Sequence, residues 1–426
     1  MINKMNKERI LLCLAHMSGK EMVFIKEAFD QNWVVPLGPN VNGFEKDLEE
    51  FVNKREGAEP LHKKVVALSA GTAAVHLALI ACGVGPGDEV LVQSFTFCAS
   101  SHPVTYLGAT PVFIDSEKES WNMDPELLEE AIKDRIAKTG KKPKAIIPVA
   151  LYGMPYQIDR ILEIANRYEI PVIEDAAEGF GSMYKGQVLG TFGEYGVLSF
   201  NGNKMITTSG GGALVCLDAD KAREILWYAT QARESYPYYQ HEAIGYNYRM
   251  SNICAGIGRG QMTIVDEHIA HHRHVQSLYE ELLKDVKGIT MHTNPGADYD
   301  SNFWLCTATL DPDLKIKGQD NAYKQVITGA VGGAAGVTHT VATATTDCQP
   351  NDNVEALRMA LDAANIESRP LWKPMHKQPV YRNNPAYTNG VSESLFKVGI
   401  CLPAGPWVTD DHVRYIVNQI KAAIVP

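Results

Sequence analysis

The sequence lacks an apolar run of the roughly 20 residues that a membrane-spanning helix needs. Its amino terminus also lacks the apolar core and the small-residue cleavage site of a secretory signal peptide. Acidic residues outnumber basic ones, 50 to 40, and the formal net charge is −10. Because an acidic chain is repelled by phosphate backbones and anionic lipids, we expect no nucleic-acid partner and no membrane partner. Small anionic ligands stay possible, since they need only local positive charge.

Cysteine is sparse and scattered in the sequence. No pair forms a C-x-x-C motif, and no group of cysteine and histidine has zinc-site spacing, so we expect no metal. This pattern is typical of buried, reduced thiols in a cytoplasmic protein. The eight cysteines are Cys13, Cys82, Cys98, Cys216, Cys254, Cys306, Cys348 and Cys401.

Short β-rich runs alternate with helical stretches between residues 63 and 175. Strands that are separated by helices of about ten or more residues need crossover connections, and these favour parallel pairing. The uninterrupted apolar runs suit strands that are buried on both faces. The sequence therefore predicts an α/β fold with a mostly parallel central sheet.

The chain is too long for one compact core in most architectures, since it has 426 residues, of which 45% are hydrophobic. We expect a large domain over residues 20–285 and a smaller α+β domain over residues 286–426. The segment 1–19 precedes both, and we expect it to pack on the smaller domain. Residues 328–346 are rich in Gly, Ala and Thr, which indicates an inserted, mobile loop or hairpin.

The first candidate site is Ser69-Ala-Gly-Thr-Ala-Ala-Val-His, which follows an apolar run and opens a helical stretch. Small residues there let a ligand approach the backbone, and a helix N-terminus offers unpaired N–H groups at the positive end of its dipole. A phosphate site and an ordinary strand–helix turn both fit the segment, because it matches no complete phosphate-loop pattern.

Two charged residues follow at places that suit a ligand. Asp175 ends the apolar run Ile173-Glu-Asp, where open α/β sheets hold ligand-binding residues, although an N-cap is the simpler explanation for it alone. Lys204 lies between polar turn residues and a glycine run. A sheltered lysine can lose its proton and form a Schiff base with an aldehyde, although an exposed loop lysine explains Lys204 when it is taken alone.

Together these segments meet the needs of pyridoxal 5′-phosphate (PLP). That cofactor requires a phosphate cradle, an acid opposite its pyridine nitrogen, a lysine for its aldehyde and a ring-stacking partner. Phe97, just beyond the apolar run Glu89-Val-Leu-Val, is a candidate for stacking, with core packing as the alternative. We therefore predict a PLP enzyme in which Lys204 is the catalytic residue.

At these residues the chain resembles the sugar aminotransferases of the DegT/DnrJ/EryC1/StrS family, which have fold type I of the PLP-dependent transferases, the fold of aspartate aminotransferase. The resemblance runs from about residue 12 to the end of the sequence, and the order and spacing of the motifs are highly specific. The motifs are Gly71-Thr-Ala-Ala-Val-His-Leu-Ala-Leu, Gly108-Ala-Thr-Pro-Val-Phe-Ile-Asp, Glu174-Asp-Ala-Ala-Glu, Gly190-Thr-Phe-Gly-Glu-Tyr-Gly, Ser199 to Lys204 and Gly245-Tyr-Asn-Tyr-Arg-Met-Ser-Asn.

Further motifs resemble family members that transfer the amino group of L-glutamate to C4 of UDP-2-acetamido-2,6-dideoxy-α-D-xylo-hexos-4-ulose, for bacterial glycan synthesis. They are Asn201-Gly-Asn-Lys-Met-Ile-Thr-Thr-Ser-Gly-Gly-Gly, Thr230-Gln-Ala-Arg-Glu, Arg369-Pro-Leu-Trp-Lys-Pro-Met-His and Gly399-Ile-Cys-Leu-Pro-Ala-Gly. The resemblance thus implies a nucleotide-sugar substrate, L-glutamate as the amino donor and a cytoplasmic homodimer with shared active sites.

The resemblance also implies roles for single residues. Lys204 would bind the cofactor aldehyde, Asp175 would pair with the pyridinium nitrogen, and Asn247 would reach the phosphate in the partner subunit. In the same way Phe97 would stack on the ring and Glu178 would lie near its hydroxyl. The cofactor phosphate is expected at Gly71, Thr72 and Ser199. The residues expected at the sugar nucleotide or the glutamate carboxylate are His16, Arg369 and His376.

Three departures from the family pattern bear on the substrate, and one of them is the insertion at residues 328–346. Ala150 stands where close relatives carry His, and the N-terminal loop reads Cys13-Leu-Ala-His16-Met17 where relatives read Ser-Pro-Pro-His-Met. A GDP- or dTDP-linked keto-sugar, as in perosamine synthesis, is therefore a second candidate substrate. The sequence also leaves open a sugar 3-dehydratase of the same fold, which would carry His in place of Lys204, and a non-catalytic regulator, which would have a damaged cofactor site.

Overall fold

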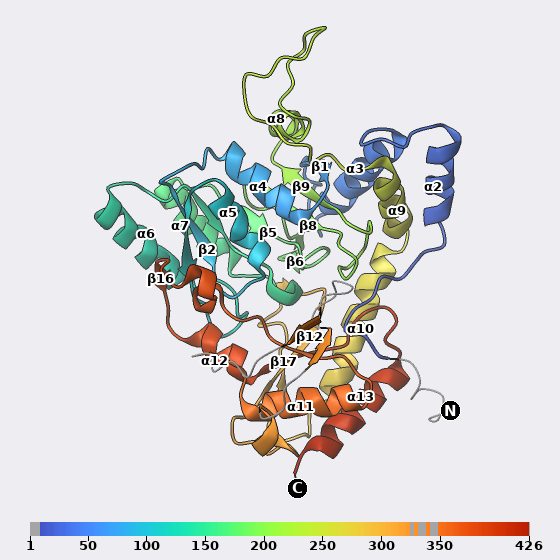
Figure 1. The fold of residues 1–426 in the computed structure, drawn as a ribbon, viewed down its shortest axis with the longest axis vertical. Helices are drawn as coiled ribbons and strands as arrows, with labels where there is room; N and C mark the ends of the chain where they lie inside the picture. Colours follow the sequence, from blue (N-terminus) through green and yellow to red (C-terminus); the bar gives the residue numbers. More distant parts are fainter. Residues whose placement is uncertain (1–8, 324–327, 331–337, 341–347, 426) are drawn as a thin grey trace.

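The computed structural model describes residues 9–323, 328–330, 338–340 and 348–425. Figure 1 shows a large sheet flanked by helices and, beside it, a smaller unit built from the C-terminal part of the chain. The strands of the large sheet are β1 (Lys64–Leu68), β2 (Glu89–Gln93), β3 (Thr110–Ile114), β4 (Ala145–Ile147), β5 (Ile173–Asp175), β8 (Tyr195–Ser199), β9 (Gly212–Cys216) and β16 (Ala386–Tyr387).

Most neighbours in the large sheet run parallel. The pairs β16–β3, β3–β2, β2–β4 and β5–β8 are parallel, whereas β9 runs antiparallel to both β1 and β8. Parallel bridges from Ile146 to Val172 and from Val149 to Asp175 join the β4 side to the β5 side. The predicted α/β fold with a mostly parallel sheet is confirmed.

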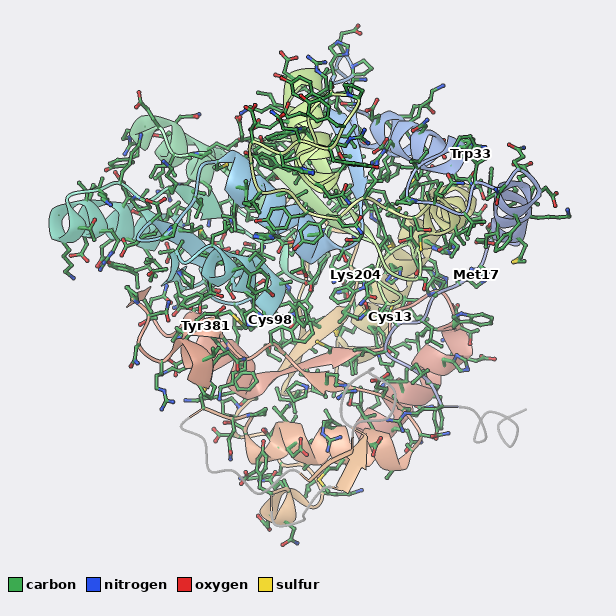
Figure 2. All side chains as sticks on the ribbon, turned by 45° about the horizontal axis from the view of Figure 1, so that its top comes forward. Cys13, Met17, Trp33, Cys98, Lys204 and Tyr381 are labelled. Carbon is green, nitrogen blue, oxygen red and sulfur yellow. The ribbon has the colours of Figure 1, made fainter. Side chains whose placement is uncertain are left out.

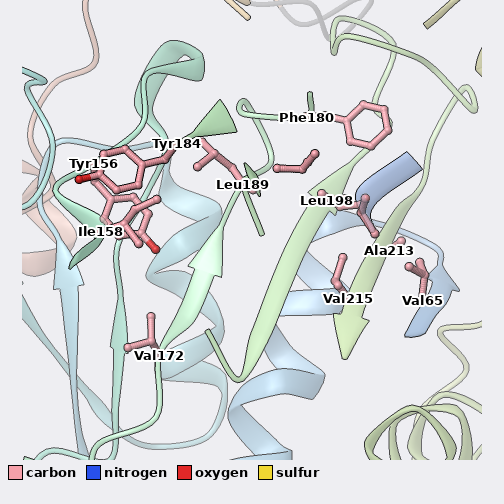
Figure 3. Close-up of a cluster of buried hydrophobic side chains, with 14 of the residues drawn as sticks. Val65, Tyr156, Ile158, Val172, Phe180, Tyr184, Leu189, Leu198, Ala213 and Val215 are labelled. Atoms are coloured by element: carbon pink, nitrogen blue, oxygen red, sulfur yellow. The ribbon is translucent and has the colours of Figure 1, made fainter. Parts of the chain in front are cut away.

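Both faces of this sheet are buried, as the continuous apolar runs predicted. On β2, Leu91 belongs to one apolar cluster, whereas Val90 and Val92 belong to another on the opposite face. Figure 3 shows part of the first cluster, with Val65, Val215 and Leu198 on adjacent strands. Burial on both faces holds the strand ends at fixed positions, and residues beyond those ends can then form a rigid site.

Helices cover the large sheet, and their ends follow ordinary capping rules. The helix α6 (Pro125–Thr139) begins after Asp124, whose carboxylate accepts from two N–H groups, and ends at Gly140 in the left-handed conformation. The other helices of this part are α2 (Glu21–Asp30), α3 (Pro39–Val52), α4 (Gly71–Ala81), α5 (His102–Tyr106), α7 (Ile158–Tyr168), α8 (Ala219–Ala229), α9 (Asn252–Met262) and α10 (Val265–Leu283). The short helices here are η1 (Cys98–Ser100) and η2 (Leu151–Gly153).

The C-terminal part has its own antiparallel sheet, in the order β10–β12–β17–β15, and its own apolar core. Its strands are β10 (Ile289–Met291), β12 (Cys306–Leu310), β15 (Arg369–Pro370) and β17 (Gly399–Leu402). Its helices are α11 (Asp352–Ala363), α12 (Val391–Val398) and α13 (Asp410–Ala423), with the short helices η3 (Gln319–Asn321), η4 (Met375–Lys377) and η5 (Pro379–Tyr381). A small sheet contains β6 (Met183–Tyr184), β7 (Gln187–Val188) and β11 (Tyr299–Asp300).

Two connections link the parts in ways that the predicted boundary at residue 286 does not capture. The end of α10 contributes Val275 and Tyr279 to the core of the C-terminal part. The strand β16 returns to the large sheet, where Ala386 pairs with Phe113. The division into two domains stays a prediction, and both of these contacts cross the predicted boundary.

The beginning of the described chain lies on the C-terminal part. Ile10 pairs with Ile366, and its side chain belongs to the same apolar core. In the predicted insertion, β13 (Thr328–Ala330) pairs antiparallel with β14 (Thr338–Thr340), and the other residues of 328–346 lie outside the described residues. None of the described helices combines the length and apolar character of a membrane span.

Candidate active site

A cavity of about 320 Å³ opens beyond the ends of β2, β5 and β8. Open α/β sheets bind ligands at this edge, and the volume lies within the roughly 300–1,000 Å³ of small-molecule sites. Figure 2 shows Lys204 between the part with the large sheet and the C-terminal part. The lining includes Ser69, Gly71, Thr72, Thr96, Phe97, Ser100, Asp175, Glu178, Ser199, Asn203, Lys204, Trp304 and Trp372.

The N-terminus of α4 forms one end of the cavity. Its N-cap residue, Ala70, has no side chain that could bind the N–H groups of the first turn, so these groups are free to bind an anion. A side chain at Gly71 would come within 3.1 Å of the Ser199 Cβ atom, and therefore glycine lets the Ser199 hydroxyl approach this helix end. Such an end suits a phosphate group.

Asp175 lies at the end of β5, where the sequence predicted it. It is 5% exposed, and its carboxylate accepts from the Ser100 hydroxyl at 2.6 Å and from the Ala177 N–H at 3.1 Å. Burial raises the pKa of Asp175, while the Ser100 bond and the charge of Lys204 act in the opposite direction. No cation of the described residues forms an ion pair with it. A buried carboxylate without an ion-pair partner suits a cationic ligand atom.

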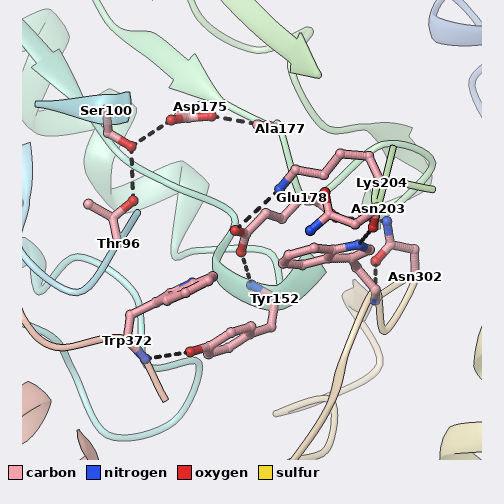
Figure 4. A network of polar contacts seen from close by, with 11 residues as sticks. Thr96, Ser100, Tyr152, Asp175, Ala177, Glu178, Asn203, Lys204, Asn302 and Trp372 are labelled. Atoms are coloured by element: carbon pink, nitrogen blue, oxygen red, sulfur yellow. Dashed lines mark hydrogen bonds and ion pairs between the residues drawn. The ribbon is translucent and has the colours of Figure 1, made fainter. Parts of the chain in front are cut away.

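Lys204 projects into the cavity from the loop after β8. Its Nζ atom lies 3.5 Å from a Glu178 oxygen and 3.9 Å from the centre of the Trp304 ring (Figure 4). The Trp304 indole is itself fixed by donating to the Asn203 carbonyl at 2.6 Å. Contacts on two sides hold the amine in place, with a carboxylate as its counter-charge and an aromatic face beneath it.

Glu178 is held from the other side by Tyr152. The Tyr152 N–H donates to the second Glu178 oxygen at 2.7 Å, and Tyr152 has a left-handed backbone, with φ 55°. Burial raises the pKa of Glu178, although the charge of Lys204 and the Tyr152 bond oppose this effect. Left-handed conformations are costly for residues other than glycine, by about 1–3 kcal/mol. The left-handed backbone at Tyr152 thus lowers the stability of the fold, while its N–H group fixes one oxygen of Glu178.

Phe97 and Trp372 form the aromatic wall opposite Lys204. Their ring centres are 5.5 Å apart, and Phe97 is 51% exposed, which excludes core packing as its role. The Trp372 backbone N–H donates to the Tyr152 hydroxyl at 2.8 Å. Figure 4 shows this bond and the contact of Tyr152 with Glu178 as parts of one network.

These features fit PLP. The uncapped end of α4 with Ser199 suits the phosphate, the buried Asp175 suits the protonated pyridine nitrogen, and Lys204 is the amine within the same cavity. Phe97 offers an exposed ring at the cavity wall. Among the described residues, no group of three or more His, Cys, Asp and Glu is placed to hold a metal ion.

His376, predicted at the substrate, lies outside the cavity lining. One ring nitrogen is 2.6 Å from the Ser94 hydroxyl, and the other is 3.2 Å from a Glu393 carboxylate oxygen. Both nitrogens are therefore engaged by protein groups. The Met375 N–H also donates to the Ser94 carbonyl at 2.8 Å, so the segment after Trp372 is fastened to the end of β2.

His16 and Arg369 also lie outside the lining. The His16 ring is 3.2 Å from His268, whose other nitrogen is 3.1 Å from the Met205 carbonyl next to Lys204. Arg369, on β15, donates to Glu367 at 2.9 Å. A substrate contact for these residues stays a prediction.

Asn247 does not join the cavity of its own chain. It is exposed and forms a bridge with Thr230, away from the lining residues. This position leaves open the predicted reach into a partner subunit. Ala150, the departure from the family pattern, is 1% exposed, and a Cβ atom on Gly179 would come within 2.8 Å of its own. Ala150 is therefore buried and packed closely against Gly179.

The sequence did not single out Ser100, Tyr152, Trp304 or Trp372 as site residues. Ser100 lies three residues after Phe97, on the turn of η1. This helical spacing from Phe97 is the sequence signal that could have identified Ser100. Trp372 lies within the motif that begins at Arg369. Tyr152 and Trp304 reach the site through tertiary packing alone.

The fold and the cavity together define a PLP-binding enzyme of fold type I. A solved structure of a DegT DnrJ EryC1 StrS aminotransferase from Brucella abortus aligns with a TM-score of 0.78 and 28% identity, over 95% of each chain. The model of the DegT/DnrJ/EryC1/StrS aminotransferase family matches residues 16–332 and 319–421. The chain belongs to this family, and it is a PLP-dependent aminotransferase.

Two curated relatives match nearly the whole chain. EpsN of Bacillus subtilis (strain 168), to which PLP-dependent aminotransferase activity is attributed, is 42% identical over 97% of this chain and 95% of its own. The GDP-perosamine synthase of Caulobacter vibrioides is 33% identical, over 98% of this chain and 99% of its own.

Proposed function

We propose that this enzyme transfers the amino group of L-glutamate to C4 of UDP-2-acetamido-2,6-dideoxy-α-D-xylo-hexos-4-ulose, as UDP-N-acetylbacillosamine transaminase does. The observation that carries the transamination is the position of Lys204 between Glu178 and Trp304, in the cavity that also contains Asp175. The choice of sugar is supported by the motifs around Lys204 and Trp372, which resemble that enzyme.

Bound PLP supplies an electron sink for the removal of a proton from the amino-acid substrate. Lys204 is the base in this proposal, because its Nζ atom takes the α-proton of L-glutamate and later delivers a proton to C4 of the sugar. Glu178, 3.5 Å away, would stabilise the lysine in each half-reaction while it holds a proton.

Asp175 keeps a negative charge opposite the pyridine nitrogen, and the bond from Ser100 fixes its orientation at 2.6 Å. Gly71, Thr72 and Ser199 bind the phosphate at the uncapped end of α4. Phe97, whose exposed ring lines the cavity, would stack on the cofactor ring. In this proposal the residues around the phosphate and the ring anchor the cofactor, and Lys204 transfers protons.

A homodimer completes the site in this proposal. Asn247 is exposed and lies outside the cavity of its own chain, so a role at the cofactor phosphate requires a second subunit. The second candidate function is transfer to a GDP-linked keto-sugar. The 33% identity to a GDP-perosamine synthase over nearly the full chain favours it.

The test compares keto-sugars that differ in their nucleotide. Holoenzyme with L-glutamate should aminate the UDP-linked 4-keto sugar faster than GDP- or dTDP-linked ones. Lys204→Ala should abolish the transfer, and Lys204→Arg, which keeps the charge and loses the nucleophile, should be equally inactive. Transfer by Lys204→Ala would refute the mechanism. A preference for the GDP-linked sugar would refute the proposed UDP-linked substrate and support the second candidate function.

A further inference from the structure

Two buried histidines on α10, His268 and His272, lie behind the candidate site. Their spacing of four residues places both side chains on one face of the helix. This helix begins in the apolar core beside the large sheet and ends in the core of the C-terminal part, so it spans both parts (Figure 1). Neither histidine lines the cavity, and the roles proposed above use neither of them.

His268 binds the segment that carries Lys204. Its Nδ1 atom lies 3.1 Å from the carbonyl oxygen of Met205, the residue that follows the lysine. Because a carbonyl only accepts, Nδ1 holds the ring proton and donates it to this bond. Burial lowers the pKa of His268, so the ring is neutral at pH 7. Its Nε2 atom is then an acceptor, and it lies 3.2 Å from the Nδ1 atom of His16.

His272 makes the equivalent contact with the segment that carries Trp304. Its Nδ1 atom lies 3.2 Å from the carbonyl oxygen of Phe303 and donates to it for the same reason. Burial lowers the pKa of His272 to about 3, so this ring is neutral as well. Phe303 has a left-handed backbone, with φ 48°. Such a conformation persists only where its surroundings fix it, and the bond from His272 is one of these restraints.

The two segments that α10 binds meet at the cavity. The Lys204 Nζ atom lies 3.9 Å from the centre of the Trp304 ring, and the Trp304 indole donates to the Asn203 carbonyl at 2.6 Å. The carbonyls before and after Lys204 are therefore both bound. Because a lysine side chain is a flexible stem, the place of its amine depends on a fixed backbone. A displacement of about 1 Å at a reacting group can slow a reaction by about 10²-fold.

We propose that His268 and His272 are positioning residues of the aminotransferase reaction. Together they hold Lys204 against the Trp304 ring from one face of α10. They act through the backbone carbonyls beside these two residues and contact neither the cofactor nor a substrate. This inference rests on the proposed role of Lys204, and it explains why two neutral imidazoles are buried behind the site.

The test separates the two ring nitrogens of His268. The side-chain amide of Asn can replace Nδ1, and that of Gln can replace Nε2, so His268→Asn keeps the bond to the Met205 carbonyl and His268→Gln loses it. At saturating L-glutamate, His268→Gln holoenzyme should lose the visible absorbance of bound PLP roughly tenfold more slowly than the wild type, as expected for one lost hydrogen bond. The half-saturating concentration of L-glutamate should not change. His268→Asn should keep most of the wild-type rate.

A second measurement uses the cofactor-free protein. Backbone amides of residues 203–207 should exchange hydrogen faster in His268→Gln than in the wild type or in His268→Asn. His271→Ala is the matched control, because it removes a histidine bond from the same helix to a different carbonyl, that of Val408 at 3.0 Å. This control should change neither the rate with L-glutamate nor the exchange of residues 203–207.

Equal slowing by Gln and Asn at position 268 would overturn the inference, and so would faster exchange without a slower reaction. If His268→Gln does not fold, as judged by circular dichroism, His272→Gln replaces it, and His272→Asn should again keep most of the rate. Amination of the sugar by Lys204→Ala would refute the proposed role of Lys204, and the inference would fail with it. An inactive Lys204→Ala together with wild-type exchange in His268→Gln would contradict the inference alone.

Discussion

Replacing Asp175 by Asn should change the stability and the activity of the enzyme in opposite directions. The side chain is 5% exposed, and burial raises its pKa above the ordinary value of about 3.9. At pH values between the ordinary pKa of the unfolded chain and the raised pKa of the folded protein, the folded, cofactor-free protein binds more protons than the unfolded chain. Its stability therefore falls as pH rises through this range. Asn has the same shape and no charge, and Asp175→Asn should remove this fall.

The expected magnitudes follow from the surroundings of Asp175. Because the raised pKa of Asp175 makes the buried charge unfavourable, cofactor-free Asp175→Asn should be more stable than the wild type at neutral pH. Loss of a charge-assisted hydrogen bond costs about 1.5–3 kcal/mol, which should weaken PLP binding by roughly 10- to 150-fold. Removal of one preorganised charge at the reacting centre should lower kcat by about 10²- to 10³-fold.

The assay combines urea denaturation of the cofactor-free protein at several pH values with a PLP titration followed by absorbance. Ser100→Ala is the matched control, because it keeps the charge and removes the 2.6 Å bond, and it should destabilise the cofactor-free protein. An Asp175→Asn protein that is less stable without PLP and retains its kcat would refute the assignment of Asp175.

Three further predictions test other parts of the site. His376→Ala releases the segment after Trp372 from Ser94, so it should raise KM for the sugar more than KM for L-glutamate in steady-state assays; equal changes would count against this role. A mixture of Lys204→Ala and Asn247→Ala subunits should regain activity through hybrid dimers, whereas no gain would argue against shared sites. Ala150→His should lower the free energy of unfolding by about 1–3 kcal/mol in thermal denaturation, because Ala150 is buried against Gly179, and an unchanged Tm would contradict this packing.

The sequence predicted the large sheet well because its strands are buried on both faces. Continuous apolar runs separated by helical stretches have few other solutions, and Asp175 at the end of such a run was placed correctly at the strand end. The return of Ala386–Tyr387 to β3 was not predictable, because two residues carry no periodicity and their pairing depends on the distant fold.

The candidate site was predicted unevenly for a similar reason. Lys204, Asp175 and Gly71 line one cavity, as local motifs and the family resemblance indicated. His376 is instead engaged by Ser94 and Glu393, since a motif fixes a residue's place along the chain but not the direction of its side chain. The unusual backbone of Tyr152 had no signal either, because left-handed conformations outside glycine depend on tertiary contacts.

Nitrogen transfer from labelled glutamate is the most direct test of the proposed reaction. The holoenzyme is incubated with ¹⁵N-L-glutamate and UDP-2-acetamido-2,6-dideoxy-α-D-xylo-hexos-4-ulose, and the nucleotide sugar is then analysed by NMR. We predict ¹⁵N bonded to C4 of the sugar with the wild-type enzyme, and none with Lys204→Ala. Absence of ¹⁵N from the sugar while glutamate loses its label to the enzyme, or the same ¹⁵N product with Lys204→Ala, would contradict it.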